Sequence, residues 1–197
     1  VSKAFIKGMR LVILFTLPAM IVMVILSTPI VSIAFERGAF TKESTLMTSQ
    51  ALVFYSIGIS STGVKLLLDK TYYSLKDTKT PMYIALITVI TNFILNSILV
   101  DSMGHRGLAL ATSLSVTMVS IIMYMDLSTK KLTVNNRKLL KFIIRVLLSS
   151  LIMGLTVFFE YKWLIGRSSQ IIAFLLTGFS GLIVYIWFCY IFRVDEI

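Results

Sequence analysis

Six blocks of about 20 apolar residues recur along this chain, separated by short basic or mixed-charge loops. The hydrocarbon core of a bilayer is about 30 Å thick and takes about 20 helical residues to cross. A membrane-spanning β-barrel would instead need alternating strands of about 10 residues, which the sequence lacks. The chain is therefore predicted to be an all-α, polytopic membrane helix bundle with six transmembrane helices. The expected spans are Leu11–Phe35, Leu46–Leu75, Met82–Val100, Leu108–Leu127, Leu140–Phe159 and Ile171–Phe192.

Composition supports a membrane location. Hydrophobic residues make up 57% of the chain and charged residues only 14%, whereas soluble domains carry about 25% charge. Of the 19 Lys and Arg residues, 13 fall on the side that holds both termini and five on the other, with Lys65 inside the second span. Basic residues mark the cytoplasmic side, so both termini are predicted to be cytoplasmic. The net charge of +10 is then a topology signal, and no nucleic-acid partner is expected.

The stretch Ser128–Lys141 is the longest polar linker between spans. It predicts two parts, a four-helix part over residues 1–129 and an appended two-helix hairpin over residues 130–197. The chain is expected to be incomplete, because it begins with Val1 and shows no signal peptide. Cys189 is its only cysteine, so no disulfide forms within one chain and a buried thiol is expected.

Catalytic and metal-binding patterns are poor. His105 is the only histidine and has neither an H-E-x-x-H partner nor a cysteine cluster, so a solvated loop residue is expected rather than a zinc ligand. Asp101 and Asp126 are expected at opposite membrane faces, too far apart to work as a carboxylate pair. No catalytic residue, metal or cofactor is predicted, and the chain is not expected to be an enzyme.

Lys65 and Asp69 are the charged residues of interest. They lie four residues apart and share one face of a helix. If Tyr72 and Tyr73 mark the interfacial aromatic belt, Lys65 lies about 10 Å inside the membrane, where an ionised group costs about 3 kcal/mol. Two interpretations remain open: Lys65 snorkels and pairs with Asp69 for helix stability, or the two line a wet cavity. A cationic cavity would suit an anionic substrate, such as a phosphate-bearing lipid.

Prolines and small residues pattern the remaining spans. Pro18 and Pro29 in the first span are hinge candidates, since each removes a helical hydrogen bond, but prolines are also routine in membrane helices. Asn92 and Asn96 share a helix face and are interpreted as hydrogen-bonding glue more than as substrate contacts. Stripes of small residues predict helix-packing surfaces. These stripes comprise Ser56–Gly63, then Ser150 with Gly154, then Ala173 with Thr177 and Gly181.

Several strings occur together in a familiar order. An outside turn "F-E-R-G-A-F-T" ends at Thr41, a "Y-S-L-K-D-T-K-T-P" stretch runs to Pro81, and "NFILNSILV" and "GLALATSLS" follow. Over residues 1–127 the chain resembles the MurJ/MviN family of lipid II flippases, within the MOP transporter superfamily. The last two spans fit the family by position and hydropathy alone.

The resemblance implies a 14-helix transporter of the bacterial cytoplasmic membrane with two lobes around a cationic cavity. Members flip lipid II, the undecaprenyl-linked peptidoglycan precursor, by alternating access. This chain would supply the last six helices, the final pair forming a lipid-tail groove, and its expected partners are lipid II, membrane lipids and a missing N-terminal lobe. Lys65 and Asp69 match the cavity-facing helix. The signature-turn residues are Arg37, Gly38, Asp77, Thr78, Lys79 and Pro81, and Asp77 is expected to cap or pin its loop.

Two other functions remain open. One is export of another undecaprenyl-linked polysaccharide unit, which the "D-T-K-T-P" string disfavours. The other is a non-transporting membrane scaffold that keeps the same fold. The cavity arginines of the missing lobe would distinguish a flippase from a scaffold.

Overall fold

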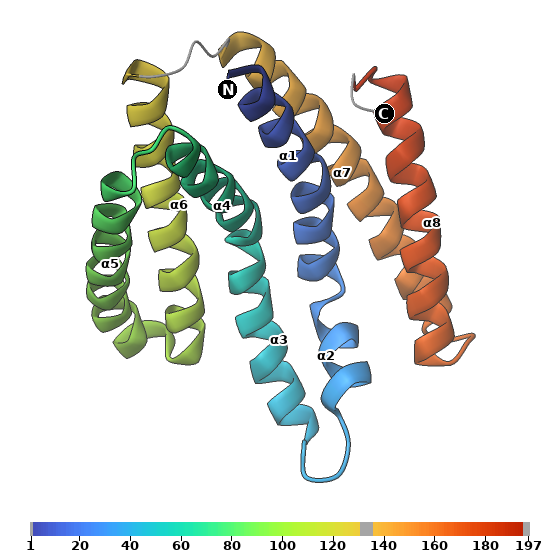
Figure 1. Ribbon diagram of the computed structural model, residues 1–197. Coiled ribbons are helices and arrows are strands. Elements are labelled where there is room, and N and C mark those ends of the chain that lie inside the picture. The colour runs from blue at the N-terminus through green and yellow to red at the C-terminus, as the bar shows by residue number, and fades with distance from the viewer. Residues whose placement is uncertain (1, 131–135, 195–197) are drawn as a thin grey trace.

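The computed structural model describes residues 2–130 and 136–194, and within these ranges the chain is helical with short turns and without strands. Figure 1 shows the long helices side by side, with the start of α1 and the end of α8 at the same end of the bundle. The predicted fold class, an all-α membrane helix bundle, is confirmed. The helices are α1 (Ser2–Ile25), α2 (Ser27–Phe35), α3 (Lys42–Ile57), α4 (Ile59–Ser74), α5 (Lys79–Met103), α6 (His105–Lys130), α7 (Asn136–Leu164) and α8 (Gln170–Ile191).

Five of the described helices, α1, α5, α6, α7 and α8, are long and apolar enough to cross a membrane. The pair α3 and α4 also passes when taken together, as one span bent by 43°, which gives the sixth predicted crossing. The bend lies at Gly58, where a Cβ would come within 2.9 Å of the Ser113 Cα on α6. Only a glycine lets the two backbones approach this closely.

The predicted first span, Leu11–Phe35, is not one continuous helix. The helix begins at Ser2, so the three basic residues that were expected to precede the membrane lie on its first turns. The chain then leaves the helical path at Leu26, between α1 and α2. Pro29 explains the break, because it offers no N–H to the Ile25 carbonyl and its ring crowds that oxygen.

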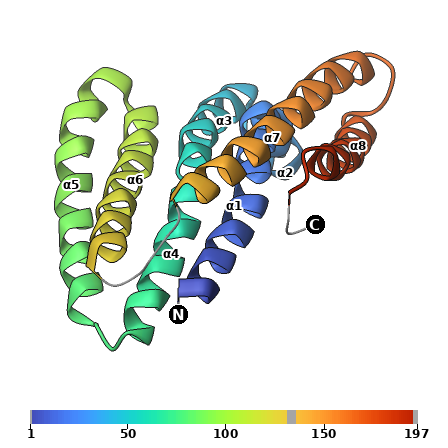
Figure 2. The ribbon, with the colours of Figure 1, turned by 90° about the horizontal axis from the view of Figure 1, so that it is seen from above.

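Small residues set the contacts between neighbouring helices. A Cβ on Gly63 would lie 2.8 Å from the Val12 side chain, so α4 packs closely on α1. Likewise, Gly154 of α7 lies against Ile21 of α1. A Cβ on Gly181 of α8 would likewise lie 2.5 Å from a Val157 methyl of α7. The small-residue stripes are therefore packing surfaces, as predicted, and Figure 2 shows the resulting order, with α7 crossing α1 and α8 beyond it.

The asparagine pair joins α5 to α6. Asn96 donates to the Asn92 side-chain oxygen at 2.9 Å, and Asn92 in turn donates to the Thr112 hydroxyl at 3.3 Å. The prediction that these amides act as glue between helices is confirmed.

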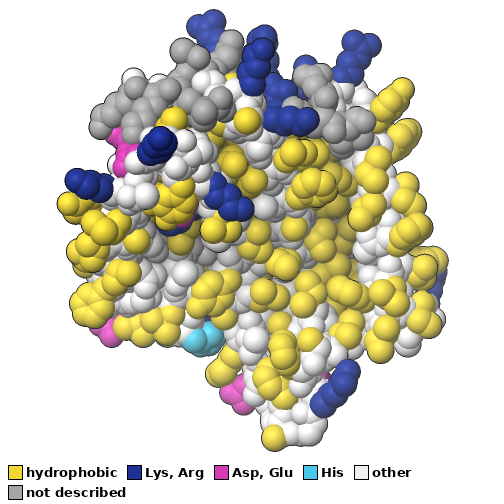
Figure 3. Space-filling view, viewed as in Figure 1, with side chains coloured by type: hydrophobic (Ala, Val, Ile, Leu, Met, Phe, Trp, Pro, Cys, Tyr) yellow, Lys and Arg dark blue, Asp and Glu magenta, His cyan; other side chains and the backbone are white. Residues whose placement is uncertain are grey.

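Charge is distributed unevenly over the bundle. In Figure 3, Lys and Arg side chains gather at the end where α1 begins, while apolar side chains cover the flanks. His105 lies exposed at the opposite end, at the start of α6, as predicted for a solvated residue. Residues 131–135 of the predicted linker, Lys131 included, lie outside the described residues.

Candidate functional site

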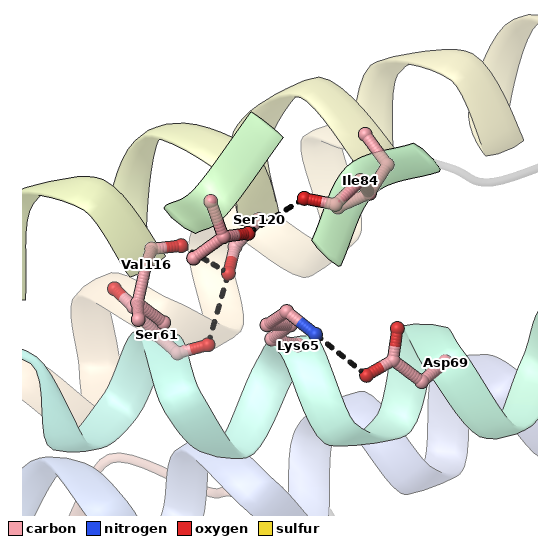
Figure 4. A network of polar contacts seen from close by, with 7 residues as sticks. Ser61, Lys65, Asp69, Ile84, Val116 and Ser120 are labelled. Carbon is pink, nitrogen blue, oxygen red and sulfur yellow. Dashed lines mark hydrogen bonds and ion pairs between the residues drawn. The ribbon is translucent and has the colours of Figure 1, made fainter. Parts of the chain in front are cut away.

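Lys65 and Asp69 form an ion pair on α4. The Lys65 ammonium lies 2.8 Å from Asp69 Oδ2, and the two side chains are 20% and 17% exposed. Figure 4 shows Lys65 reaching along its own helix toward the carboxylate. The second carboxylate oxygen of Asp69, Oδ1, is buried without a hydrogen-bond partner among the described residues. Both side chains are thus mostly shielded from solvent, and Asp69 Oδ1 can still accept a hydrogen bond.

Hydroxyl groups fix the face of α4 beside this pair. The Thr117 hydroxyl of α6 donates to Ser61 Oγ at 2.8 Å, and the Ser120 hydroxyl lies 3.0 Å from the Ser61 carbonyl. Figure 4 shows Ser61 one turn before Lys65 on the same side of the helix. These contacts hold α4 against α6 and so fix the direction in which Lys65 points.

An exposed stripe runs along α4 next to the ion pair. Thr62, Leu66, Lys70 and Tyr73 are all exposed, and their spacing of three and four residues places them on one helix face. Lys65 and Asp69 each precede a member of this stripe by one residue. The ion pair therefore borders a face of α4 that the described residues leave uncovered.

A hollow of about 440 Å³ lies beside α4, between α1, α4, α6 and α7. Its walls are mainly apolar, and its α4 contribution comes from Ser60, Ser61 and Val64. Ser60 Oγ is buried without a hydrogen-bond partner among the described residues. Ser61 lies one turn before Lys65, so the hollow and the ion pair are neighbours along α4, although neither Lys65 nor Asp69 lines the hollow.

The first signature turn joins α2 to α3. Arg37 donates to the Ile33 carbonyl at 3.4 Å, at the end of α2, and Gly38 takes a φ of +60°, which glycine adopts without strain. Thr41 then caps α3, accepting from the Ser44 N–H at 3.2 Å. The residues of this string stop one helix and start the next.

The second signature turn joins α4 to α5. The Asp77 N–H donates to the Tyr72 carbonyl at 3.0 Å, with Lys76 at φ 58°, which is the Schellman ending of a helix. The Asp77 carboxylate then accepts from the Thr80 N–H at 3.0 Å and from its hydroxyl at 2.8 Å. Asp77 thus ends α4 with its backbone and caps α5 with its side chain, as expected.

The other residues of this turn belong to the start of α5. Thr78 precedes the helix, Lys79 is its first residue and Pro81 lies in its first turn. A proline costs no hydrogen bond in a first turn. Thr78 and Lys79 are both exposed, so the structure assigns them no role beyond the turn.

Tyr72 does not belong to the aromatic belt that the sequence suggested. Its side chain is fully buried rather than interfacial, and its hydroxyl lies 2.7 Å from Asp126 Oδ2 on α6. Tyr73 is exposed, as a belt residue would be. Sequence reasoning missed the Tyr72–Asp126 contact, although the predicted topology places the end of the second span and the end of the fourth on the same membrane side.

The two prolines differ in their effect on the helix. Pro18 lies inside α1, which continues through it, whereas Pro29 lies just after the break at Leu26. The carbonyl that Pro18 leaves without its helical donor belongs to Leu14, and the Tyr185 hydroxyl of α8 donates to it at 2.6 Å. Nothing in the sequence pointed to Tyr185.

The titratable side chains give little support to metal binding. Within residues 2–130 and 136–194, no three His, Cys, Asp or Glu side chains come together as metal ligands would. Cys189 is buried, as predicted.

Comparison with known proteins points to one family. A family model described as lipid II flippase MurJ matches residues 1–174. The chain is 32% identical to the lipid II flippase MurJ of Thermosipho africanus over 96% of its length, and 32% identical to a probable lipid II flippase MurJ of Vibrio cholerae over 89%. It spans 37% and 34% of those two relatives.

A solved structure agrees with the sequence relatives. The structure of a lipid II flippase MurJ in an inward closed conformation superposes with a TM-score of 0.83 and 31% identity. The match covers 99% of this chain and 40% of that one.

Proposed function

We propose that this chain, which belongs to the lipid II flippase MurJ family, supplies the C-terminal helices of a transporter that flips lipid II. The substrate would be the undecaprenyl-pyrophosphate-linked peptidoglycan precursor, carried across the bacterial cytoplasmic membrane by alternating access. The cellular role would be cell-wall biogenesis and maintenance of cell shape. The chain would work with an N-terminal lobe that faces it across a cavity.

The observation that carries this proposal is the ion pair beside the uncovered stripe of α4. A Lys buried among membrane helices is costly unless it faces a partner or water, and Lys65 has Asp69 at 2.8 Å. An approaching pyrophosphate would compete with Asp69 for the ammonium. Asp69 would then be the partner that holds Lys65 between transport cycles.

The orientation and the division of the chain belong to the same proposal. We infer that both termini of the chain are cytoplasmic, since Lys and Arg gather in Figure 3 at the end of the bundle where α1 begins. Residues 1–129 would form the four-helix part of the transporter lobe, and residues 130–197 the appended hairpin. The exposed apolar side chains of α8, such as Leu175 and Phe179, suit contact with a polyprenyl tail.

The test compares charge removal at the two members of the pair. In the complete protein that carries residues 1–197, Lys65→Leu should abolish rescue of cells depleted of their lipid II flippase, while Asp69→Asn should impair rescue less. Lys42→Leu is the matched control, because it removes an exposed positive charge at the start of α3. Membrane insertion of each variant is checked by fractionation.

The outcomes separate the open functions. Rescue by Lys65→Leu equal to that of the parent would show that Lys65 only stabilises its helix. A larger defect in Asp69→Asn than in Lys65→Leu would indicate cation coupling at Asp69 instead of anion binding. Failure of the complete, inserted parent protein to rescue would favour export of another undecaprenyl-linked unit or a scaffold role. Rescue by residues 1–197 alone would contradict the need for a facing lobe.

A further inference from the structure

Pro18 removes a hydrogen bond from the middle of α1. In an α-helix the carbonyl of residue 14 accepts from the N–H of residue 18, and proline has no N–H. Leu14 is 4% exposed, so water does not reach its carbonyl readily. A backbone oxygen without a hydrogen-bond donor inside a membrane destabilises the fold, because no water is there to replace the lost donor.

Tyr185 supplies a replacement donor from another helix. Its hydroxyl lies 2.6 Å from the Leu14 oxygen, and its side chain is 8% exposed. Tyr185 lies on α8, 171 residues away in sequence. Figure 2 shows α7 lying across α1 with α8 beyond it, so the contact joins two helices that α7 otherwise separates.

A second contact ties α8 to the other side of the Leu26 break. Gln170 at the start of α8 donates to the Ser32 hydroxyl of α2. The hairpin therefore holds α1 through Tyr185 and α2 through Gln170, on either side of the point where the helix is interrupted. Any bending of this segment must move the hairpin or break one of these contacts.

We propose that Tyr185 is a positioning residue that fixes the course of α1 at Pro18 by donating to the Leu14 carbonyl, so that the terminal hairpin and α1 move as one unit. Its importance for transport rests on the proposed flippase function, whereas the coupling itself does not. When the contact breaks, α1 becomes free to bend at Pro18. The hairpin thereby does more than border a lipid path, because it controls the stiffness of a helix in the lobe.

The test is a double-mutant cycle read by amide hydrogen exchange in the complete protein. Tyr185→Phe keeps the ring and removes the donor, so amides of α1 around Pro18 should exchange about threefold to tenfold faster, the factor expected from losing one hydrogen bond. Tyr190→Phe is the matched control, since Tyr190 lies on the same helix and is 76% exposed. In the Tyr190→Phe variant, the amides of α1 should exchange at the rate of the parent.

The second arm restores the donor on α1 itself. Pro18→Ala returns an N–H to the Leu14 carbonyl, so adding Tyr185→Phe to Pro18→Ala should leave α1 exchange at the level of Pro18→Ala alone. A Tyr185 that merely fills space would not be rescued by this change on a different helix. The proposal is overturned if the α1 amides exchange at the same rate in Tyr185→Phe as in Tyr190→Phe. It is also overturned if they exchange as fast in the double variant as in Tyr185→Phe.

Rescue of flippase-depleted cells gives the functional readout. Tyr185→Phe should lower rescue and Pro18→Ala should suppress that loss. Faster exchange with unimpaired rescue would overturn the positioning role in transport. Failure of the parent protein to rescue would overturn the proposed flippase function while leaving the exchange result to decide the coupling.

Discussion

The buried contact between Tyr72 and Asp126 makes a quantitative stability prediction. Tyr72→Phe keeps the ring in its fully buried site and removes a hydroxyl that lies 2.7 Å from the carboxylate. Hydrogen bonds to charged groups contribute about 1.5 to 3 kcal/mol. Asp126 has further interactions in the folded chain, so the loss should fall at the lower end of that range.

The measurable effect is a lower unfolding temperature. For a unit of about 150 to 250 residues each kcal/mol corresponds to a shift of about 2 to 4 °C, and a larger protein shifts less. Tyr72→Phe should therefore lower the midpoint of the complete protein by at most about 3 to 6 °C. The assay is thermal unfolding of the purified complete protein in one detergent, followed by tryptophan fluorescence. Tyr73→Phe is the matched control, because the adjacent tyrosine is 54% exposed and should stay within about 0.5 kcal/mol of the parent.

A double-mutant cycle isolates the contact. In an Asp126→Ala background, Tyr72→Phe should cost less than in the parent, with a coupling of about 1 kcal/mol or more. The reasoning is refuted if Tyr72→Phe unfolds at the same temperature as the parent, or if Tyr73→Phe loses as much stability as Tyr72→Phe. It is also refuted if the effect of Tyr72→Phe is unchanged when Asp126 is absent.

Two further predictions follow from the turn geometry and from the charge distribution. A Cβ at Gly107 would lie 2.3 Å from the Leu99 carbonyl oxygen, so Gly107→Ala should destabilise the protein by about 1 to 3 kcal/mol, seen as a lower unfolding temperature. Gly178→Ala, whose Cβ would meet nothing within 4 Å, is the control, and equal unfolding temperatures would contradict the clash. In a Cys189→Ala background, His105→Cys should react with an impermeant thiol reagent added outside the cell and Arg137→Cys should not. The opposite labelling pattern would reverse the proposed orientation.

The sequence by itself determined the features that depend on neighbouring residues. Apolar runs of membrane-crossing length predicted where the helices lie, because the length of such a run can be read directly from consecutive residues. Asp77 was expected to cap or pin its loop, and it caps α5 through Thr80, three residues away. Pro29 was expected to disturb the first span, and the chain leaves the helix at Leu26. The effects of Asp77 and Pro29 each act within about one helical turn.

Only the tertiary structure decided which distant groups meet. Tyr72 looked like an interfacial residue by position and is a buried partner of Asp126, 54 residues away. Pro18 looked equivalent to Pro29, yet α1 continues through it with Tyr185 hydrogen-bonded at the freed carbonyl. The bend of α3 and α4 likewise depends on how closely Ser113 approaches Gly58. Hydropathy does not specify such pairings, because they depend on how helices far apart in sequence pack together.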